Sequence, residues 1–382
     1  MISNPAAGRG QARRQGPRVA RAFRAQGWTV EVAETDGPLH ATHLAGEAAG
    51  RGVERVIALG GDGTVHEVAN GLLHARSSAL FAVIPVGSGN DFAKLTGTHP
   101  HRHDVERAVA KIVTATPRRF DAGRVLDEYF VNSMGFGFGP AVVRTRNAMP
   151  ALRGFLSYLI PVLRSFASYR PVRLEVRAAE HRETGNLMML EVCNGTTAGG
   201  DYRFAPDADP GDGRLDVCLI RAVSLPRFLL AIPRVMRGTH GAMREVALFR
   251  TRTLTIRGEA PLLLHLDGEL RAPGATECTV TVEPGCLNVL VAKCAGRSDG
   301  RTVGQRQHAR CSLSFCPSVR PSDCPPKTSS RPARGSSPPT RRIASARGAP
   351  SGARCCSPAG ARPPRGGTSP ARYSPRGKAS PR

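Results

Sequence analysis

Three glycine-rich segments in the first half of the chain carry residue types that suit phosphate binding. They span residues 4–8, 60–64 and 85–91, and each follows a short strand-like run. Glycine lets a backbone approach a phosphate closely, and a helix beginning after such a loop offers free N–H groups and a positive dipole end. One such loop alone could be a simple tight turn, but three at the carboxyl edge of one sheet favour a phosphate-binding site.

Two well-known phosphate motifs are excluded. No Gly-x-x-x-x-Gly-Lys-Ser/Thr occurs, and no Gly-x-Gly-x-x-Gly lies in the first strand-to-helix turn. A further glycine run at residues 135–139 falls in the expected second domain, and we expect it to lack the helix that the dinucleotide motif requires. We therefore assign that run to backbone packing.

Two carboxylates are candidates for a general base. Asp267 and Glu269 follow the apolar run 262–266, and a carboxylate at a strand end can take the proton of an attacking hydroxyl. The alternative is a hairpin turn with exposed acids, and the sequence does not rank the two residues. Asp62, in the second glycine loop, is a further candidate as a magnesium or water ligand.

An acidic turn at residues 207–216 precedes a strand-like run. Carboxylates and backbone carbonyls crowded into one turn are typical ligands of hard cations such as Mg²⁺. A solvated Asx turn is the competing interpretation.

Two histidines accompany these motifs. His66 lies in the helix after the second loop, either near phosphates or, as we favour, on the helix surface. His265 is expected to be packed or hydrogen-bonded in its strand. Thr64 and Glu67 have the spacing of a capping box, Thr-x-x-Glu, at the start of that helix.

The elements that must position these residues alternate over the first 120 residues. Apolar periodicity predicts helices at residues 11–26, 40–50, 64–74 and 104–113, and strands at residues 28–33, 55–59 and 80–85. This alternation favours a parallel sheet with crossover helices.

The pattern changes near Phe120 to short strands separated by turns. We expect strands at residues 129–133, 172–177, 187–193, 215–220, 253–257, 262–266, 278–282 and 287–292, with helices at 152–166 and 225–237. This predicts an antiparallel, β-sandwich-like second domain.

The last 82 residues differ from the rest. They hold 17 Lys/Arg against one acid, Asp323, which gives +16 of the chain's total of +24. Rich in Arg, Pro, Ser, Gly and Ala, this tail should be disordered. It could anchor the protein to anionic lipid or contact nucleic acid, but a frameshifted or read-through end is favoured, so we expect no specific nucleic-acid partner.

Composition indicates in which cellular compartment the protein works. No run of 18 apolar residues occurs, and the first 11 residues lack the apolar core of a secretory signal. The ten cysteines show no CxxC spacing in the body, which favours reduced, partly buried thiols and a cytoplasmic protein.

Two long motifs carry a family resemblance. Residues 60–71, GGDGTVHEVANG, and 84–93, IPVGSGNDFA, resemble the diacylglycerol kinase catalytic-domain superfamily, most of all its soluble bacterial lipid kinases, which are similar to sphingosine kinases. The resemblance spans about residues 1–294 and includes the opening Asn4-Pro5 and the late Asp267-Gly268-Glu269. NAD kinases and phosphofructokinases share the Gly-Gly-Asp-Gly loop but not the later motifs.

The resemblance implies an ATP- and Mg²⁺-dependent kinase that phosphorylates a hydroxyl of a diacylglycerol-like or long-chain lipid at a membrane surface, with ATP in a cleft between two domains. Its general base corresponds to Glu269 or Asp267, and its structural Mg²⁺ site to Asp209, Asp212 and the carbonyl of Arg214. The nucleotide contacts would be Asn4, Pro5, Ala6, Ala7, Gly8, Thr35, Gly61, Asp62, Gly63, Thr64, Val65, His66, Glu67 and Ser88.

The expected organisation follows. Residues 1–120 form an α/β nucleotide-binding kinase domain with a parallel sheet, like NAD kinase and phosphofructokinase. Residues 121–294 form a β-sandwich-like lipid- and metal-binding domain whose last strand could return to the first, and residues 295–382 form the disordered basic tail. The protein is expected to associate peripherally with membranes. The sequence leaves a homodimer open and does not name the lipid.

Two departures from the family pattern keep alternatives open. Only Met1 and Ile2 precede Ser3, where the family has a full strand, so either the start is misassigned or the first loop is poorly anchored. The first loop also lacks the serine that commonly precedes Gly8. Two other functions compete with a lipid kinase: a kinase of a soluble substrate such as NAD, and a non-catalytic nucleotide-binding regulator.

Overall fold

The structure is a computed structural model that describes residues 1–98, 104–149 and 156–292, the first three residues of the last range by backbone alone. All of these residues belong to one compact unit, residues 1–301. The predicted tail, residues 295–382, lies outside the described residues, as does Cys294. The remaining four cysteines of the body are free thiols.

A parallel sheet forms the core of the N-terminal domain. Its strands lie in the order β2-β1-β3-β4, and all three pairings are parallel. The strands are β1 (Ile2–Ser3), β2 (Ala33–Glu34), β3 (Arg55–Gly60) and β4 (Leu80–Pro85).

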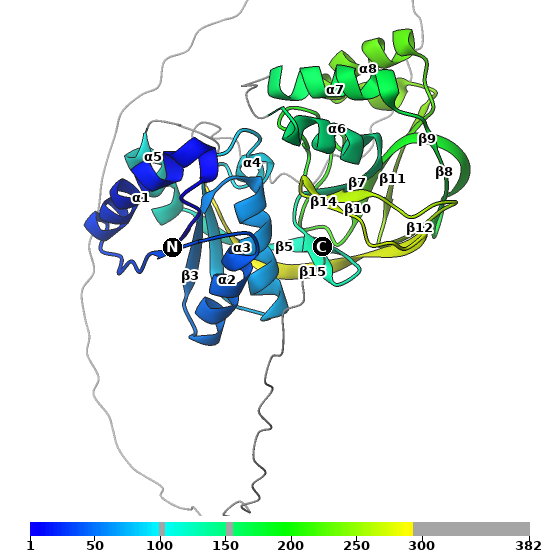
Figure 1. Cartoon of the computed structure of the whole chain (residues 1–382). Coiled ribbons are helices and arrows are strands. Elements are labelled where there is room, and N and C mark those ends of the chain that lie inside the picture. Colours follow the sequence, from blue (N-terminus) through cyan, green and yellow to red (C-terminus); the bar gives the residue numbers. More distant parts are fainter. Residues whose placement is uncertain (99–103, 150–155, 293–382) are drawn as a thin grey trace, which may run out of the picture. The chain divides into compact units, whose positions relative to one another are not determined.

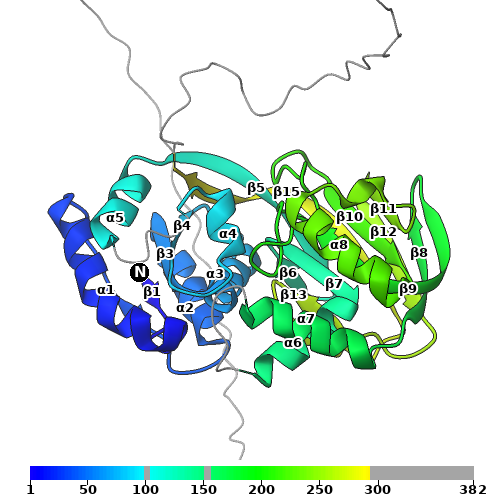
Figure 2. The same ribbon diagram turned by 90° about the horizontal axis from the view of Figure 1, so that it is seen from above.

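Helices cover both faces of this sheet (Figure 2). Alternate side chains of β3 point to opposite sides, so Ile57 and Leu59 pack against α1 and α5, whereas Val56 and Ala58 pack against α2 and α3. The helices are α1 (Ala7–Ala25), α2 (His40–Gly50), α3 (Asp62–His74), α4 (Asp91–Leu95) and α5 (Val105–Val113). The predicted parallel α/β domain is confirmed.

Antiparallel strands build the second region (Figure 1). Its central order is β14-β13-β7-β9-β8-β12-β15, and β10 and β11 extend it beside β9. The strands are β5 (Thr116–Val125), β6 (Glu128–Phe130), β7 (Ser133–Gly137), β8 (Val172–Ala178), β9 (Arg182–Cys193), β10 (Leu215–Arg221), β11 (Val246–Thr251), β12 (Thr253–Gly258), β13 (Leu264–Leu266), β14 (Glu269–Arg271) and β15 (Glu277–Val291).

One long strand links the two regions. β15 pairs with β12 near its start and with β4 through Val289 and Phe81 near its end. The two strands predicted at residues 278–282 and 287–292 are therefore parts of a single strand.

Three helices gather on one side of the β-rich region (Figure 1). They are α6 (Phe138–Asn147), α7 (Leu156–Ser168) and α8 (Leu225–Arg237), and a 3-10 turn, η1 (His240–Ala242), follows α8. Phe138, Phe166 and Phe228 stack among these helices and join them to Met189 and Cys218 of the sheet. No helix in the described part of the chain is both long and apolar enough to span a bilayer.

Several predicted elements were wrong. The strand expected at residues 28–33 is reduced to β2, because its neighbour β1 offers only two residues for pairing. The glycine run at residues 135–139 was expected to lack a following helix, but α6 begins at Phe138. The sequence analysis also missed β11 and the first half of β5.

The first glycine loop is well anchored despite its short strand. The Asn4 N–H donates to the carbonyl of Leu59 at 3.1 Å, and the Asn4 side chain donates to Thr64 Oγ1 at 3.2 Å. The Ala6 N–H in turn donates to Asn4 Oδ1. A poorly anchored first loop was one of two alternatives that the sequence left open, and these contacts contradict it.

Candidate active site

A cavity of about 850 Å³ lies between the parallel sheet and the β-rich region. Its polar end is lined by the three glycine loops. Its other end is apolar and lies among α6, α8 and the strands beneath them. Every predicted nucleotide contact except His66 lines the cavity, as do Asp267 and Glu269, whereas Asp209, Asp212 and Arg214 do not.

The second and third glycine loops touch each other. A Cβ added to Gly61 would lie 3.3 Å from the Cα of Gly87, so the two backbones pack directly. This close approach leaves backbone groups of both loops at one edge of the cavity, as phosphate binding requires.

The first loop ends in three consecutive left-handed residues. Gly8, Arg9 and Gly10 have φ values of 59°, 60° and 80°, and a regular helix follows them. The Gly10 N–H donates to the carbonyl of Ala6 at 3.2 Å, and of these three residues Gly8 lines the cavity. The positive φ of Arg9 is a strained conformation of the kind that gathers at functional sites.

Asp62 is half-buried between the second and third loops. Its two carboxylate oxygens accept the backbone N–H groups of Asn90 and Asp91, both at 2.9 Å. Burial and the nearby Asp91 carboxylate raise the pKa of Asp62 to about 6, although these two hydrogen bonds oppose the shift. Asp62 therefore fixes the third loop.

The predicted capping box does not form. The helix α3 begins at Asp62 with Gly61 as its N-cap, so Thr64 lies inside the first turn. Thr64 instead accepts from Asn4, and the Glu67 carboxylate accepts the N–H of Ala41 at the start of α2. These side chains tie α3 to its neighbours.

Asp267 is a buried, fully engaged carboxylate. Oδ1 accepts the N–H groups of Asn132 and Ser133 at 2.8 and 3.0 Å, and Oδ2 accepts that of Val131 at 3.0 Å. Oδ2 also lies 2.9 Å from Nδ1 of His66. Asp267 thus joins the turn before β14 to the start of β7 and to α3.

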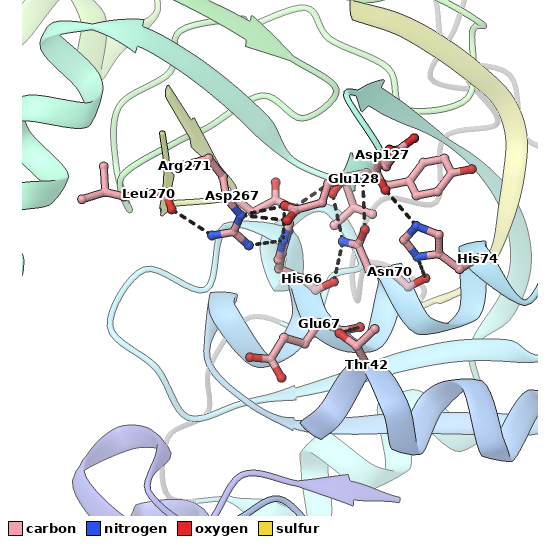
Figure 3. A network of polar contacts seen from close by, with 12 residues as sticks. Thr42, His66, Glu67, Asn70, His74, Asp127, Glu128, Asp267, Leu270 and Arg271 are labelled. Carbon is pink, nitrogen blue, oxygen red and sulfur yellow. Dashed lines mark hydrogen bonds and ion pairs between the residues drawn. The ribbon is translucent and has the colours of Figure 1, made fainter. Parts of the chain in front are cut away.

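His66 forms the centre of a charged network rather than a surface site (Figure 3). It is only 3% exposed, and its Nε2 lies 3.8 Å from Glu128 and 3.5 Å from Arg271. Arg271 in turn binds Glu128 at 2.8 Å. Our preference for a surface histidine was wrong.

The network favours protonated His66. Burial alone lowers the pKa of His66, but the hydrogen bond to Asp267 and the nearby carboxylate of Glu128 outweigh it and raise the pKa to about 9. His66, 3.8 Å away, is the main cause that lowers the pKa of Glu128 to about 2, although burial opposes it. With His66 charged, the carboxylates of Asp267 and Glu128 face the cations of His66 and Arg271, and the four charges sum to zero.

Glu269 differs from Asp267 in its surroundings. Its side chain is exposed, lines the cavity and approaches the second loop, because a Cβ added to Gly63 would lie 2.7 Å from Glu269 Oε1. It is therefore an exposed carboxylate beside the second glycine loop.

The acidic turn is paired with arginines. Arg118 contacts Asp209, and Arg250 lies 3.5 Å from Asp212 and 2.9 Å from Asp216. Within the described residues no group of three or more His, Cys, Asp and Glu is arranged to hold a metal ion. A cation at this turn would compete with both guanidinium groups, so Mg²⁺ at Asp209, Asp212 and Arg214 stays a prediction.

The structure adds cavity residues that sequence reasoning did not select. Arg13 of α1 and Arg146 of α6 are cationic, and Asn132, Glu191 and Tyr202 are polar. These residues belong to no recognisable sequence motif. They lie on separate elements, and only the fold brings them together.

The fold and cavity define a class of protein, one in which a parallel α/β region with three glycine loops faces an apolar chamber in a β-rich region. Two family models match in turn: "Diacylglycerol kinase catalytic domain" over residues 1–125, and "YegS C-terminal NAD kinase beta sandwich-like domain" over residues 132–291. The chain belongs to this diacylglycerol kinase-like family of bacterial lipid kinases, which confirms the resemblance.

Individual relatives agree. The "Diacylglycerol kinase" of Bacillus subtilis (strain 168) is 29% identical over 270 residues, 70% of this chain and 88% of that protein. A "Probable lipid kinase YegS-like" of Pseudomonas savastanoi pv. phaseolicola is 30% identical over 275 residues, 70% and 85% of the two chains. A crystal structure of a diacylglycerol kinase from Bacillus anthracis str. Sterne, 19% identical, shares the fold with a TM-score of 0.57 and covers 76% of this chain and 95% of that one.

Proposed function

We propose that the protein transfers the γ-phosphate of ATP to a hydroxyl of a diacylglycerol-like or long-chain lipid. The observation that carries this proposal is the two-ended cavity. Glycine loops suited to phosphates line one end, and Phe138, Val162, Met188 and Phe228 line the other. A soluble substrate such as NAD would leave this apolar end without a partner, whereas an acyl chain fits it.

We assign the general base to Glu269. Its exposed carboxylate next to Gly63 can accept the proton of the lipid hydroxyl while the hydroxyl oxygen attacks the γ-phosphorus and the bond to the β-phosphate oxygen breaks. Asp267 is less suited to this role, because its oxygens already accept three backbone N–H groups and face His66. It acts as a positioning residue for the turn that bears Glu269.

The nucleotide residues would act mainly by positioning and by charge. The backbones of Gly8 and of residues 61–64 line the cavity and would supply N–H donors for phosphates. Asp62 lines the cavity beside them and offers carboxylate oxygens to Mg²⁺, which would neutralise phosphate charge when bound. Arg13 and Arg146 add positive charge from the two regions.

The outer face of α8 fits a membrane surface. Its inner residues, Phe228, Ala231 and Val235, line the cavity, whereas Leu225 and Leu229 are 52% and 48% exposed. The same helix carries the basic residues Arg227, Arg234 and Arg237. Exposed leucines and arginines on one helix are typical of binding to anionic lipid, so α8 would bring the apolar chamber to the membrane.

A lipid panel with labelled ATP tests the function. We expect labelled phosphate in diacylglycerol or a long-chain lipid alcohol presented in detergent micelles, and none in NAD. Gly61→Val should abolish ATP binding measured by calorimetry, because the larger side chain must separate Gly61 from Gly87. The proposal is wrong if only NAD is labelled, or if ATP binds without transfer to any lipid.

A further inference from the structure

A buried carboxylate and imidazole lie in the wall of the cavity. Glu191 of β9 and His265 of β13 have side chains only 1% and 7% exposed, and His265 Nε2 lies 3.4 Å from Glu191 Oε2. Both residues line the cavity. A carboxylate is almost never found in such an environment without a partner or a ligand.

The sheet builds this pair across a glycine. Gly135 of β7 is the register partner of His265 on one side and of Glu191 on the other. The outer strands are therefore about 10 Å apart, and the two side chains meet above the glycine. A Cβ at Gly135 would collide with both, and one at Gly139 of α6 would lie 3.1 Å from His265 Nε2. Two glycines thus make the room that this pair occupies.

The pair is only half satisfied. Glu191 Oε1 and His265 Nδ1 are buried and have no hydrogen-bond partner among the described residues. The hydroxyl of Tyr202, which lines the same cavity, is also unpartnered. Unpaired buried polar atoms are costly and rare, and in a cavity wall they indicate groups that a ligand or ordered water satisfies.

The position of the pair fits a lipid headgroup. His265 precedes Asp267 by two residues, about 7 Å along the chain, and the turn at Asp267 leads to Glu269. Two residues before Glu191, on the same face of β9, Met189 lines the cavity and packs in the apolar cluster among α6, α7 and α8. The pair therefore stands between the reacting end of the cavity and its apolar end.

We propose that Glu191 and His265 bind a second hydrogen-bond donor, a hydroxyl or amino group, carried by the lipid beside the hydroxyl that is phosphorylated. This inference rests on the proposed lipid kinase function. Glu191 Oε1 needs a donor, and the ester groups of a diacylglycerol offer only acceptors. A monoacylglycerol or a long-chain amino alcohol carries the required donor. The preferred substrate is thus a lipid alcohol with one further donor.

The test compares lipids that differ in this donor. Turnover of the full chain is measured on monoacylglycerol, a long-chain amino alcohol and diacylglycerol of equal chain length, in mixed micelles with ATP. A hydrogen bond to a charged group corresponds to about 10–100-fold, so we expect kcat/KM to favour a donor-bearing lipid by at least tenfold.

Variants of Glu191 assign the preference to the pair. Glu191→Gln keeps size and one acceptor and should reduce the ratio in part, whereas Glu191→Leu should reduce it to about threefold or less. Glu277→Leu, at an exposed carboxylate on β15, is the matched control and should leave the ratio unchanged. If Glu191→Leu fails to fold, the near-isosteric Gln variant decides.

The contrary results are distinct. A wild-type protein without preference, or a preference that survives both substitutions, overturns the subsite. If the wild-type protein phosphorylates no lipid, the proposed function fails by itself. Lipid binding measured by calorimetry without ATP then tests the subsite. The proposal is supported if Glu191→Gln binds the monoacylglycerol more weakly than the wild-type protein does while diacylglycerol binding is unchanged. It is overturned if the variant and the wild-type protein bind the monoacylglycerol equally well.

Discussion

Asp267 and Glu269 are two residues apart, yet the structure gives them different chemistry. Asp267 is buried and receives hydrogen bonds on both oxygens, whereas Glu269 is exposed in the cavity beside Gly63. The sequence could not rank them, because burial of a turn depends on what packs against it. Here the start of β7 and His66 of α3 supply that packing.

Protonated His66 should make stability depend on pH. Its pKa is raised from 6.5 to about 9, so its contribution is complete below pH 6.5 and disappears as the pH rises through 9. Relative to His66→Asn, the wild-type free energy of unfolding should exceed that of the variant most at pH 6, by a few kcal/mol, and little at pH 10.

Urea unfolding at pH 6, 8 and 10 measures this difference. His74→Asn, on the same helix but without the two carboxylates, is the control and should show a constant difference. Parallel pH profiles for wild type and His66→Asn would show that the histidine is not charged in the folded protein.

Gly63 leaves the space that Glu269 occupies. In Gly63→Ala the new Cβ would lie 2.7 Å from Glu269 Oε1, so the carboxylate must move. We expect kcat to fall at least tenfold with little change in the KM for ATP, since misplacing a catalytic group costs rate rather than binding. Gly46→Ala in α2, where nothing lies within 4 Å, is the control. Unchanged kcat in Gly63→Ala would remove Glu269 from the reaction.

At the scale of elements, apolar periodicity predicted most helices and strands closely. The helix expected at residues 40–50 is α2 (His40–Gly50), and the strand expected at residues 80–85 is β4. The failures have physical causes. Residues 28–33 have strand-like composition, but only Ala33–Glu34 find a partner strand, and pairing cannot be seen in one segment alone.

The outer face of α8 should decide membrane binding. Replacing the exposed Leu225 and Leu229 by Asp removes apolar area and adds negative charge, so binding to phosphatidylglycerol vesicles should weaken at least tenfold. Leu39→Asp, at a leucine that is 62% exposed in the N-terminal domain, is the control. Cosedimentation with vesicles measures the effect. Equal losses in both variants, or none in either, would argue against α8 as the membrane face.

In the whole molecule, sequence motifs located the polar end of the cavity but not its apolar end. The glycine loops are local signals, and all three meet at one edge of the parallel sheet. The apolar chamber is formed by side chains of α6, α8 and β9. In the sequence, each of these side chains looks like an ordinary residue of the hydrophobic core. Glu191 was missed for the same reason, since its meaning depends on Gly135 and His265 in neighbouring strands.

The central claim is that Glu269 acts as the base of an ATP-dependent lipid kinase. Turnover of Glu269→Gln on the best lipid, measured together with ATP affinity by calorimetry, tests it most directly. We predict a loss of ~10²–10⁴-fold in kcat with ATP affinity within about threefold of wild type. The exposed Glu277→Gln should behave like wild type. Turnover of Glu269→Gln within about threefold of the wild-type value would contradict the account.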